Sequence, residues 1–253
     1  MTSAQSPLVY LHGLPGSPDE VPLICGAPSL LFAPNLRDGP LDPQIRAQFG
    51  TQPVTLIGFS LGAFRALRFA ADQPERVAHL HLIAPAAPLE LGDFLGQMAG
   101  GPIFRIARDN PKLFRLVTRL QAFAARIAPE FFAAQIFSTA QGDDIALKAK
   151  SGFLRDWGHI ARHCLADGAQ AYRDEITAYV APWSDLLGRV QTPTNIWYGG
   201  ADNWTPPAMA EALIKKLPIA PQMRRIENAS HYSTLAAALT QITAPYRKAN
   251  NPC

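Results

Sequence analysis

One serine in this sequence stands between two glycines, in a spacing that suits nucleophilic chemistry. Residues 58–62 read Gly-Phe-Ser-Leu-Gly, with Ser60 at the centre. An apolar, strand-like segment ends at Ile57, and a helical pattern begins at Leu61. Small flanking residues let the chain turn sharply from strand to helix, and the turn presents the central hydroxyl above the sheet. The hydroxyl then lies near the positive end of a helix dipole. We therefore predict that Ser60 is a nucleophile, rather than part of a glycine-rich loop that only packs.

Two further residues complete the group that serine chemistry needs. A serine hydroxyl is a weak nucleophile at neutral pH, so it requires a base for its proton and a carboxylate that orients the base. Asp202 comes just after one strand-like segment, in Gly-Gly-Ala-Asp, and His231 comes a few residues after another. All three residues thus follow predicted strands, at the end of the sheet where open α/β folds carry their sites. We predict that Ser60, His231 and Asp202 form a catalytic triad.

The elements that must position these residues alternate between strands and helices. Short apolar runs bounded by Gly, Pro and Asn are separated by helical patterns, which is typical of βα units around a parallel sheet. Strands are predicted at residues 8–11, 30–32, 54–57, 80–83, 195–198 and 223–226. The helices that pack on this sheet are predicted at residues 61–71, 207–217 and 233–242.

The middle of the chain has a different pattern. Helical periodicity dominates there, and the predicted helices are residues 103–108, 111–127, 131–137, 143–149, 156–164 and 169–180. A connection of about a hundred residues is too long for one crossover between strands. We therefore predict a helical cap over residues 87–188, inserted between a first core segment (1–86) and a second (189–253).

Composition limits the class of protein. The 253 residues carry 23 Lys and Arg against 20 Asp and Glu, and 48% of them are hydrophobic. This indicates one ordered globular unit with an insertion and no basic surplus for nucleic acid. The three cysteines are far apart, which favours neither a disulfide framework nor a zinc site. No signal peptide and no membrane-spanning segment is recognised, so we expect a cytoplasmic protein without a membrane partner, monomeric or homodimeric.

Together these motifs resemble those of the α/β-hydrolase superfamily, in its capped members with a serine nucleophile. The motifs that carry the resemblance are Gly58-Phe59-Ser60-Leu61-Gly62, Leu11-His12-Gly13-Leu14-Pro15-Gly16, Gly199-Gly200-Ala201-Asp202 with Pro206, and His231. The resemblance implies a three-layer α/β-hydrolase fold, a site without cofactor, and an oxyanion hole made by the backbone N–H groups of Leu14 and Leu61.

The sequence departs from the family pattern at two places. Family members usually have two strands before the His-Gly loop, whereas this loop begins at residue 12. The resemblance therefore implies a mostly parallel sheet of about six strands. The family also commonly has glycine before its histidine, where this sequence has Ser230.

Other titratable residues offer alternative roles. Asp38 and Asp185 could each be the acid, but both lie on the wrong side of their neighbouring strands. His12 could be a base, although a structural role in its loop fits better. His79 and His81 are interpreted as core or surface residues of a strand.

A metal site is the less favoured interpretation of a second pair of histidines. His159 and His163 lie at helical spacing with Cys164 adjacent, yet no Glu follows His159 and no third ligand is evident. We therefore predict no metal.

The predicted cap carries basic and aromatic residues. Its basic residues recur at helical spacing: Arg105, Arg108, Lys112, Arg115 and Arg119. We interpret them as a solvated face, with steering of anionic substrates or contact with a membrane surface as alternatives. Phe59, Trp183 and Trp204 are predicted to line an apolar substrate pocket near Ser60.

The prediction from sequence is a serine hydrolase that cleaves a small-molecule ester, of the carboxylesterase or lactonase type, through an acyl-enzyme. The same triad could serve perhydrolysis, as in cofactor-free haloperoxidases, or hydrolysis of a C–C bond. A fold kept only for ligand binding is a more distant alternative, and an acyl transferase is the most distant.

Overall fold

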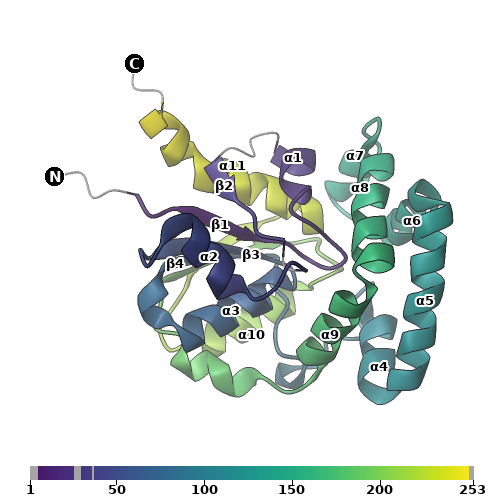
Figure 1. The fold of residues 1–253 in the computed structure, drawn as a ribbon, viewed down its shortest axis with the longest axis horizontal. Helices are drawn as coiled ribbons and strands as arrows, with labels where there is room; N and C mark the ends of the chain where they lie inside the picture. Colours follow the sequence, from purple (N-terminus) through teal and green to yellow (C-terminus); the bar gives the residue numbers. More distant parts are fainter. Residues whose placement is uncertain (1–4, 26–29, 36, 251–253) are drawn as a thin grey trace.

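A parallel β-sheet lies at the centre of the fold (Figure 1). The computed structural model describes residues 5–25, 30–35 and 37–250. Within them the sheet has six strands in the order β2-β1-β3-β4-β5-β6, and every neighbouring pair is parallel. The strands are β1 (Leu8–Leu11), β2 (Leu31–Phe32), β3 (Val54–Phe59), β4 (Val77–Ile83), β5 (Thr194–Gly199) and β6 (Gln222–Ile226). The predicted fold class and the number of strands are confirmed.

The burial of the strands follows their sequences. β3 reads Val-Thr-Leu-Ile-Gly-Phe and is buried along its whole length, as expected of an inner strand with helices on both faces. β6 reads Gln-Met-Arg-Arg-Ile and is mostly exposed. Because β6 is an edge strand, its charged side chains protect the open edge from pairing with another chain.

Five helices of the described chain cover the sheet. They are α1 (Glu20–Cys25), α2 (Leu41–Phe49), α3 (Gly62–Asp72), α10 (Pro207–Lys216) and α11 (His231–Asn250). Helices α1 and α11 lie on one face, and α2, α3 and α10 lie on the other (Figure 1). The predicted inner side of α3 is confirmed, because Phe64, Leu67 and Ala70 are all buried. This arrangement puts the start of α3 at the carboxyl end of β3.

Only helices and turns connect β4 to β5, and every residue of this connection is described. The helices are α4 (Gly101–Asp109), α5 (Pro111–Ile127), α6 (Pro129–Ile136), α7 (Asp144–Lys148), α8 (Phe153–Arg162) and α9 (Ala169–Val180). Helices α4, α5, α6 and α8 form a group beside the sheet (Figure 1). This is the helical insertion that the sequence predicted, and we call it the cap; its boundaries at residues 87 and 188 stay a prediction.

Several helix starts differ from the prediction: α3 and α7 begin one residue late, and α4, α6 and α11 begin two residues early. α8 begins three residues early, at Phe153, because Gly152 adopts φ +81° and starts the helix there; it then continues into a π-helical turn, His163–Asp167. By contrast, the predicted bounds of α5 are confirmed, and Asn110 Oδ1 accepts a hydrogen bond from Leu113 N at 3.0 Å as its N-cap.

An aromatic cluster joins the cap to the sheet domain. Trp157 of α8 donates its indole N–H to the Tyr232 hydroxyl of α11 at 2.7 Å, and both side chains are buried. The ring of Phe137 packs against both of them, with centroids 5.0 and 5.5 Å away. Because these three residues come from different parts of the chain, the cap and the sheet domain share one core.

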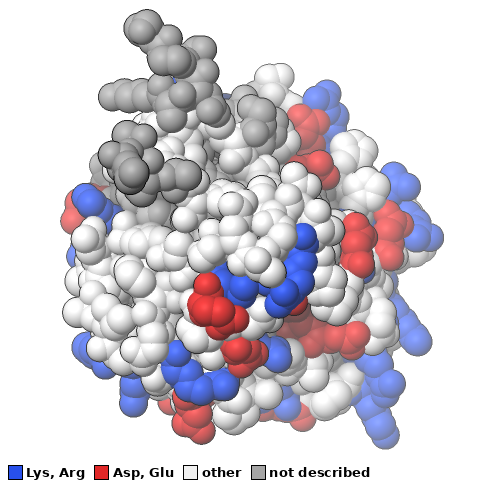
Figure 2. All heavy atoms as spheres, turned by 60° about the vertical axis from the view of Figure 1, so that its left-hand side comes forward, with Lys and Arg blue, Asp and Glu red and all other residues white. Residues whose placement is uncertain are grey.

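The surface carries both signs of charge. On the face shown in Figure 2, Lys and Arg side chains are interspersed with Asp and Glu, and areas with neither lie between them. In the part of the chain that the structure describes, no helix combines the length and the apolar character needed to cross a bilayer.

Candidate active site

Ser60 lies in a strained turn between β3 and α3. Its φ is +55°, a left-handed conformation that residues other than glycine rarely adopt. The glycines on either side are required by close packing: a Cβ on Gly58 would come within 2.7 Å of Ala63 Cα, and one on Gly62 would overlap the carbonyl oxygen of Leu11. The sequence therefore folds into the sharp strand-to-helix turn that the glycine spacing predicted.

The end of β4 holds this turn. Ser60 N–H donates to the carbonyl of Ile83 at 3.0 Å, and the carbonyl of Ser60 accepts from Ala86 N–H at 3.1 Å. Ala84, between them, also has a positive φ, +43°. Its N–H donates to the carbonyl of Trp197 in β5 at 2.7 Å, so the end of β4 also contacts the strand that leads to Asp202.

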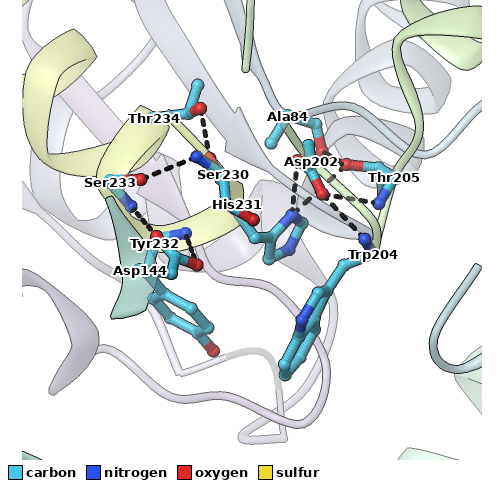
Figure 3. Close-up of polar contacts among 10 residues, drawn as sticks. All are labelled: Ala84, Asp144, Asp202, Trp204, Thr205, Ser230, His231, Tyr232, Ser233 and Thr234. Carbon is cyan, nitrogen blue, oxygen red and sulfur yellow. Dashed lines mark hydrogen bonds and ion pairs between the residues drawn. The ribbon is translucent and has the colours of Figure 1, made fainter. Parts of the chain in front are cut away.

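Asp202 is buried in the loop after β5, and its carboxylate is surrounded by donors. Oδ1 accepts hydrogen bonds from the N–H groups of Trp204 and Thr205, at 2.8 and 2.9 Å. Oδ2 lies 3.0 Å from the Thr205 hydroxyl and 2.9 Å from His231 Nδ1. These contacts fix the carboxylate, so one oxygen faces the imidazole (Figure 3). They also set the tautomer in which Nδ1 carries the proton and donates it to the carboxylate.

His231 is the first residue of α11, and its imidazole is buried between two aromatic rings. The Trp204 indole stacks on it at a centroid distance of 5.2 Å and an interplanar angle of 15°. The Phe59 ring lies 4.6 Å away on a tilted plane. Among the described residues, no hydrogen bond joins the imidazole to the Ser60 hydroxyl; Phe59, the residue before Ser60, contacts the ring instead. The structure thus brings His231 and Asp202 into direct contact. Ser60 is linked to this pair through its neighbour in the chain, Phe59, whose ring packs on the imidazole.

A carboxylate from the cap fixes the start of α11. Asp144 of α7 is fully buried and accepts hydrogen bonds from Tyr232 N–H at 3.0 Å and Ser233 N–H at 2.7 Å (Figure 3). The hydroxyl of Ser233 accepts from Ser230 N–H at 2.8 Å. These bonds satisfy N–H groups that every helix start leaves free. Because His231 is the first residue of this helix, Asp144 helps to set the position of its backbone.

A buried glutamate, Glu20, forms hydrogen bonds that hold the His-Gly loop. Glu20 of α1 accepts hydrogen bonds from the Tyr10 hydroxyl at 2.7 Å and from Gly13 N–H at 3.3 Å. Burial raises the pKa of Glu20 to about 8, although both hydrogen bonds act in the opposite direction.

His12 is also buried and its Nδ1 lies 2.9 Å from the carbonyl of Gly13. Burial lowers the pKa of His12 to about 3, so this histidine is neutral and its contacts are structural.

A cavity of about 210 Å³ opens beside Ser60, between the sheet domain and the cap. Ser60, Leu14 and Leu61 all line it. Leu14 and Leu61 therefore lie beside Ser60 on the same wall; the role of their N–H groups as an oxyanion hole stays a prediction. The rest of the wall is mainly apolar and comes largely from the cap: Met98, Ala99, Gly100, Ile103, Phe104, Phe132, Ile136, Leu165, Tyr172 and Ile176.

Few polar groups border this cavity. Two of them, Gln121 Oε1 of α5 and Trp204 Nε1, are buried and have no hydrogen-bond partner among the described residues. The other wall residues with polar side-chain groups are Ser60, Gln135, Thr139, Tyr172 and Thr205. A mainly apolar cavity with a small number of polar points is typical of a small-molecule site.

The three aromatic residues predicted for the pocket have different locations. Trp204 lines the cavity, whereas Phe59 and Trp183 are not among the residues of its wall. Phe59 points into the core and packs on His231 and Tyr232. Trp183 packs on Phe64 of α3, with ring centroids 4.7 Å apart. Both are buried, and their rings are taken up by contacts in the core rather than by the cavity wall.

The remaining candidates lie away from the site. The rings of His79 and His81 contact each other in β4 with centroids 4.8 Å apart, and His163 pairs with Asp167 at 2.9 Å. In residues 5–25, 30–35 and 37–250, no group of three or more His, Cys, Asp or Glu side chains could hold a metal ion. Cys164 is a buried free thiol, and burial raises its pKa to about 11. The Cys25 side chain and Cys253 lie outside the described part of the structure.

Sequence reasoning missed several residues that position the site. Thr205 follows Asp202 by three residues and precedes two prolines, a spacing typical of an aspartate that accepts hydrogen bonds from its own turn, so a local signal existed. Asp144 contacts Tyr232 and Ser233 of α11 from 88 and 89 residues away in the sequence, and no local signal could reveal it. Gln121 and Glu20 were also missed, since only the packing of α5 and α1 places them at the site.

The parallel sheet, the strained serine turn and the buried His231–Asp202 pair define a protein of the α/β-hydrolase type. A family model described as the alpha/beta hydrolase fold matches residues 38–237. The chain belongs to this family, which places it among enzymes of the α/β-hydrolase fold, as the sequence motifs predicted.

Individual relatives are more distant. A pimeloyl-[acyl-carrier protein] methyl ester esterase of Neisseria meningitidis serogroup A is 28% identical over 174 residues, which cover 68% of this chain and 49% of that protein. This chain thus spans about half the length of that curated relative. A thermophilic esterase from Thermogutta terrifontis superposes with a TM-score of 0.69 at 18% identity, covering 98% of this chain and 91% of the other. A bromoperoxidase from Bacillus anthracis superposes with a TM-score of 0.64 at 16% identity, covering 98% and 93%. At such identities these two structures show the fold alone.

Proposed function

We propose that this protein is a serine esterase that cleaves a small-molecule ester through an acyl-enzyme. The observation that carries the proposal is the position of Ser60. It sits in a strained turn on the wall of a mainly apolar cavity, and Leu14 and Leu61, the predicted oxyanion-hole residues, line the same wall. The imidazole of His231 packs on the ring of Phe59, the residue before Ser60, and Asp202 holds it through a hydrogen bond at Nδ1. The names of the esterase relatives support the same class of reaction.

In this mechanism Ser60 Oγ attacks the ester carbonyl carbon while Nε2 of His231 accepts the hydroxyl proton. In unliganded enzymes the bond between such a base and its serine is often long, and it tightens when substrate binds. Asp202 stabilises the imidazolium that forms, because its carboxylate is buried beside Nδ1. The carbonyl oxygen becomes negative and is stabilised by the N–H groups of Leu14 and Leu61, each worth about 10²–10³ in rate.

Collapse of this intermediate breaks the bond to the alcohol oxygen. His231 returns the proton to that oxygen, so a neutral alcohol leaves and the acyl group stays on Ser60. Water then repeats the sequence: His231 takes its proton, the hydroxide attacks the acyl carbon, and the acid leaves as Ser60 regains its proton. No cofactor takes part in the proposed reaction.

The cavity limits the substrate class. A volume of about 210 Å³ with a mainly apolar wall suits an ester with a short or medium apolar group. Gln121 Oε1 and Trp204 Nε1 have no partner in the described chain, so a substrate with polar groups besides the ester would satisfy them. Esters of this kind are the preferred candidates, ahead of long unsubstituted acyl chains.

Labelling with a fluorophosphonate probe tests the nucleophile, and a panel of p-nitrophenyl esters from acetate to palmitate tests the cavity. Ser60→Ala should abolish labelling and lower kcat by about 10⁵–10⁶-fold. Ser151→Ala, which changes an exposed serine of the cap, is the matched control and should label and turn over like the parent. Labelling that persists in Ser60→Ala, or full turnover by it, would refute the proposal.

A further inference from the structure

The outward side of α5 carries an apolar stripe. Its members are spaced by three or four residues, so they lie on one side of the helix. They are Leu113 (41% exposed), Leu116 (52%), Leu120 (60%), Phe123 (65%) and Ile127 (65%). The opposite side of α5, with Phe114, Thr118 and Ala125, is the one buried against the cap. The stripe therefore faces away from the protein, and in Figure 1 α5 lies at the outer edge of the molecule on the side away from the sheet.

Basic residues follow one side of this stripe. At 100° per residue, Lys112, Arg115, Arg119 and Arg126 fall between the buried side and the apolar stripe, and all four are exposed. The residues of α5 include no Asp or Glu. Arg126 forms a weak ion pair with Asp167 at 3.7 Å. α5 is thus divided into three longitudinal zones: one buried, one basic and one apolar.

Exposed apolar side chains of this size and continuity require an explanation. Scattered single exposed leucines are ordinary, whereas contiguous apolar patches of more than a few hundred Å² are rare on monomers and mark contact sites. Packing against this chain is not the explanation, because α5 already has a buried side. A helix with leucine and phenylalanine beside a row of Arg and Lys is typical of segments that lie in a membrane interface.

We propose that α5 docks this protein on the surface of an anionic phospholipid membrane. The apolar stripe enters the boundary between headgroups and acyl chains, and the basic row contacts lipid phosphates. The expectation of no membrane partner rested on the lack of a spanning segment, and surface docking needs none.

A second copy of this chain fits the stripe less well. A stable protein interface buries about 800 Å² on each partner and needs a broad complementary surface, whereas the apolar stripe runs along a single helix at the edge of the molecule. Pairing two α5 helices along their stripes would also bring Arg115 and Arg119 of both copies together, with no acidic residue of α5 between them. A lipid interface accepts a single amphipathic helix and supplies the opposite charge.

Docking would also place the cavity wall at the interface. Gln121 of α5 and Phe132 and Ile136 of α6 line the cavity. The same helix therefore contributes its outer side to the membrane and an inner residue to the cavity. The docking proposal is independent of the chemistry at Ser60, because it rests only on the outer side of α5.

Flotation with vesicles tests the proposal. The full chain should bind vesicles of phosphatidylcholine with phosphatidylglycerol, and bind vesicles of phosphatidylcholine alone much more weakly. High salt should reduce the anionic binding. Arg115→Gln/Arg119→Gln should weaken it roughly 30-fold, because each basic side chain near an anionic surface contributes about a five-fold factor. Leu116→Gln/Leu120→Gln/Phe123→Gln should weaken it by roughly 100-fold or more, since three large side chains no longer leave water.

The matched control is Ile219→Gln/Met223→Gln, which removes two exposed apolar side chains from the region of β6, and it should bind like the parent. Circular dichroism and turnover of p-nitrophenyl acetate show that each variant is folded, because none of these residues lines the cavity. Failure of the parent chain to bind anionic vesicles overturns the proposal. A dimer that light scattering detects and that the Leu116→Gln/Leu120→Gln/Phe123→Gln variant dissociates overturns it in favour of a second copy.

Discussion

The carboxylate of Asp202 illustrates how much of the site depends on individual hydrogen bonds. Both its oxygens are occupied by donors, and only one of these donors is the imidazole. The carboxylate is therefore held by its own loop, through Trp204 and Thr205, independently of His231. A preorganised acceptor of this kind sets the tautomer of the histidine before any substrate binds.

Asp202→Asn should preserve the structure of the loop after β5 and remove most of the esterase activity. The asparagine oxygen can still accept from the N–H groups of Trp204 and Thr205, but its amide would donate toward Nδ1 and favour the wrong tautomer. We expect kcat for p-nitrophenyl acetate to fall by about 10⁴-fold with little change in thermal stability. Asp185→Asn, which alters the exposed alternative acid, is the control and should keep full activity. A large loss in the control would assign the acid to Asp185 instead.

Glu20 predicts a pH dependence of stability. Its pKa is about 8 in the folded protein, well above the ordinary value of 4.5. Between these two values the folded state holds a proton that the unfolded state releases, so stability falls as the pH rises from about 4.5 to 8. Glu20→Gln keeps the shape and the acceptor for Tyr10 and Gly13 N–H but cannot ionise.

Thermal unfolding measured at pH 5 and pH 8 checks this prediction. The decrease in Tm between the two pH values should be smaller in Glu20→Gln than in the parent. Subtracting the two proteins cancels the contribution of His12, whose lowered pKa of about 3 reduces stability as the pH falls below 6.5. An identical decrease in both proteins would mean that Glu20 does not titrate in this range. The exposed Glu227→Gln serves as the control with an unchanged pH profile.

At the scale of elements, the start of α11 depends on a side chain from the cap. Asp144→Ala would leave Tyr232 N–H and Ser233 N–H without their acceptor, which costs about 1–2 kcal/mol, as for other helix caps. Because His231 is the first residue of this helix, we expect kcat to fall more than KM rises. Asp143→Ala, at the exposed neighbouring position, should change neither. Unfolding by urea and kinetics on p-nitrophenyl acetate measure the two effects, and unaltered values in Asp144→Ala would contradict the positioning role.

What the sequence predicts well at this scale is local. The strands were predicted because each is a short apolar run between turn residues, and the ends of α5 because Asn110 and Pro111 form a start signal that acts within one turn. The Ser60 turn was predicted from two glycines. The roles of Asp144, Glu20 and Gln121 were not, because they arise where the cap or α1 meets residues distant in the sequence. Phe59 and Trp183 were predicted to line the pocket but are not part of the cavity wall. The sequence does not reveal this, because the direction of a side chain depends on how the layers pack.

At the scale of the whole molecule, the aromatic cluster implies that the cap and the sheet domain unfold together. Tyr232→Phe would leave the buried indole N–H of Trp157 without its acceptor, at a cost of about 1–3 kcal/mol. For a chain of this length, Tm should fall by roughly 3–10 °C. Far-ultraviolet circular dichroism and tryptophan fluorescence should still report one common transition. Two separate transitions in the parent would contradict a shared core.

Tyr246→Phe is the matched control for this substitution. Its hydroxyl donates to the carbonyl of Ser6 at 3.0 Å from a half-buried position, where water can replace the lost partner. We therefore expect its Tm to stay within a few degrees of the parent. A loss as large as that of Tyr232→Phe would show that any tyrosine hydroxyl, rather than the link between cap and sheet, accounts for the effect.

Ile83, the last residue of β4, and Ala84, which follows it, contact both halves of the site. Ile83 supports the Ser60 turn through its carbonyl, and the carbonyl of Ala84 lies 2.9 Å from the hydroxyl of Thr205, which also contacts Asp202. A displacement of this strand end would therefore carry nucleophile and acid in the same direction. The distance between Ser60 and Asp202 is therefore preserved when the sheet deforms. Substitutions in the cap can accumulate during evolution without separate changes at the serine and at the aspartate.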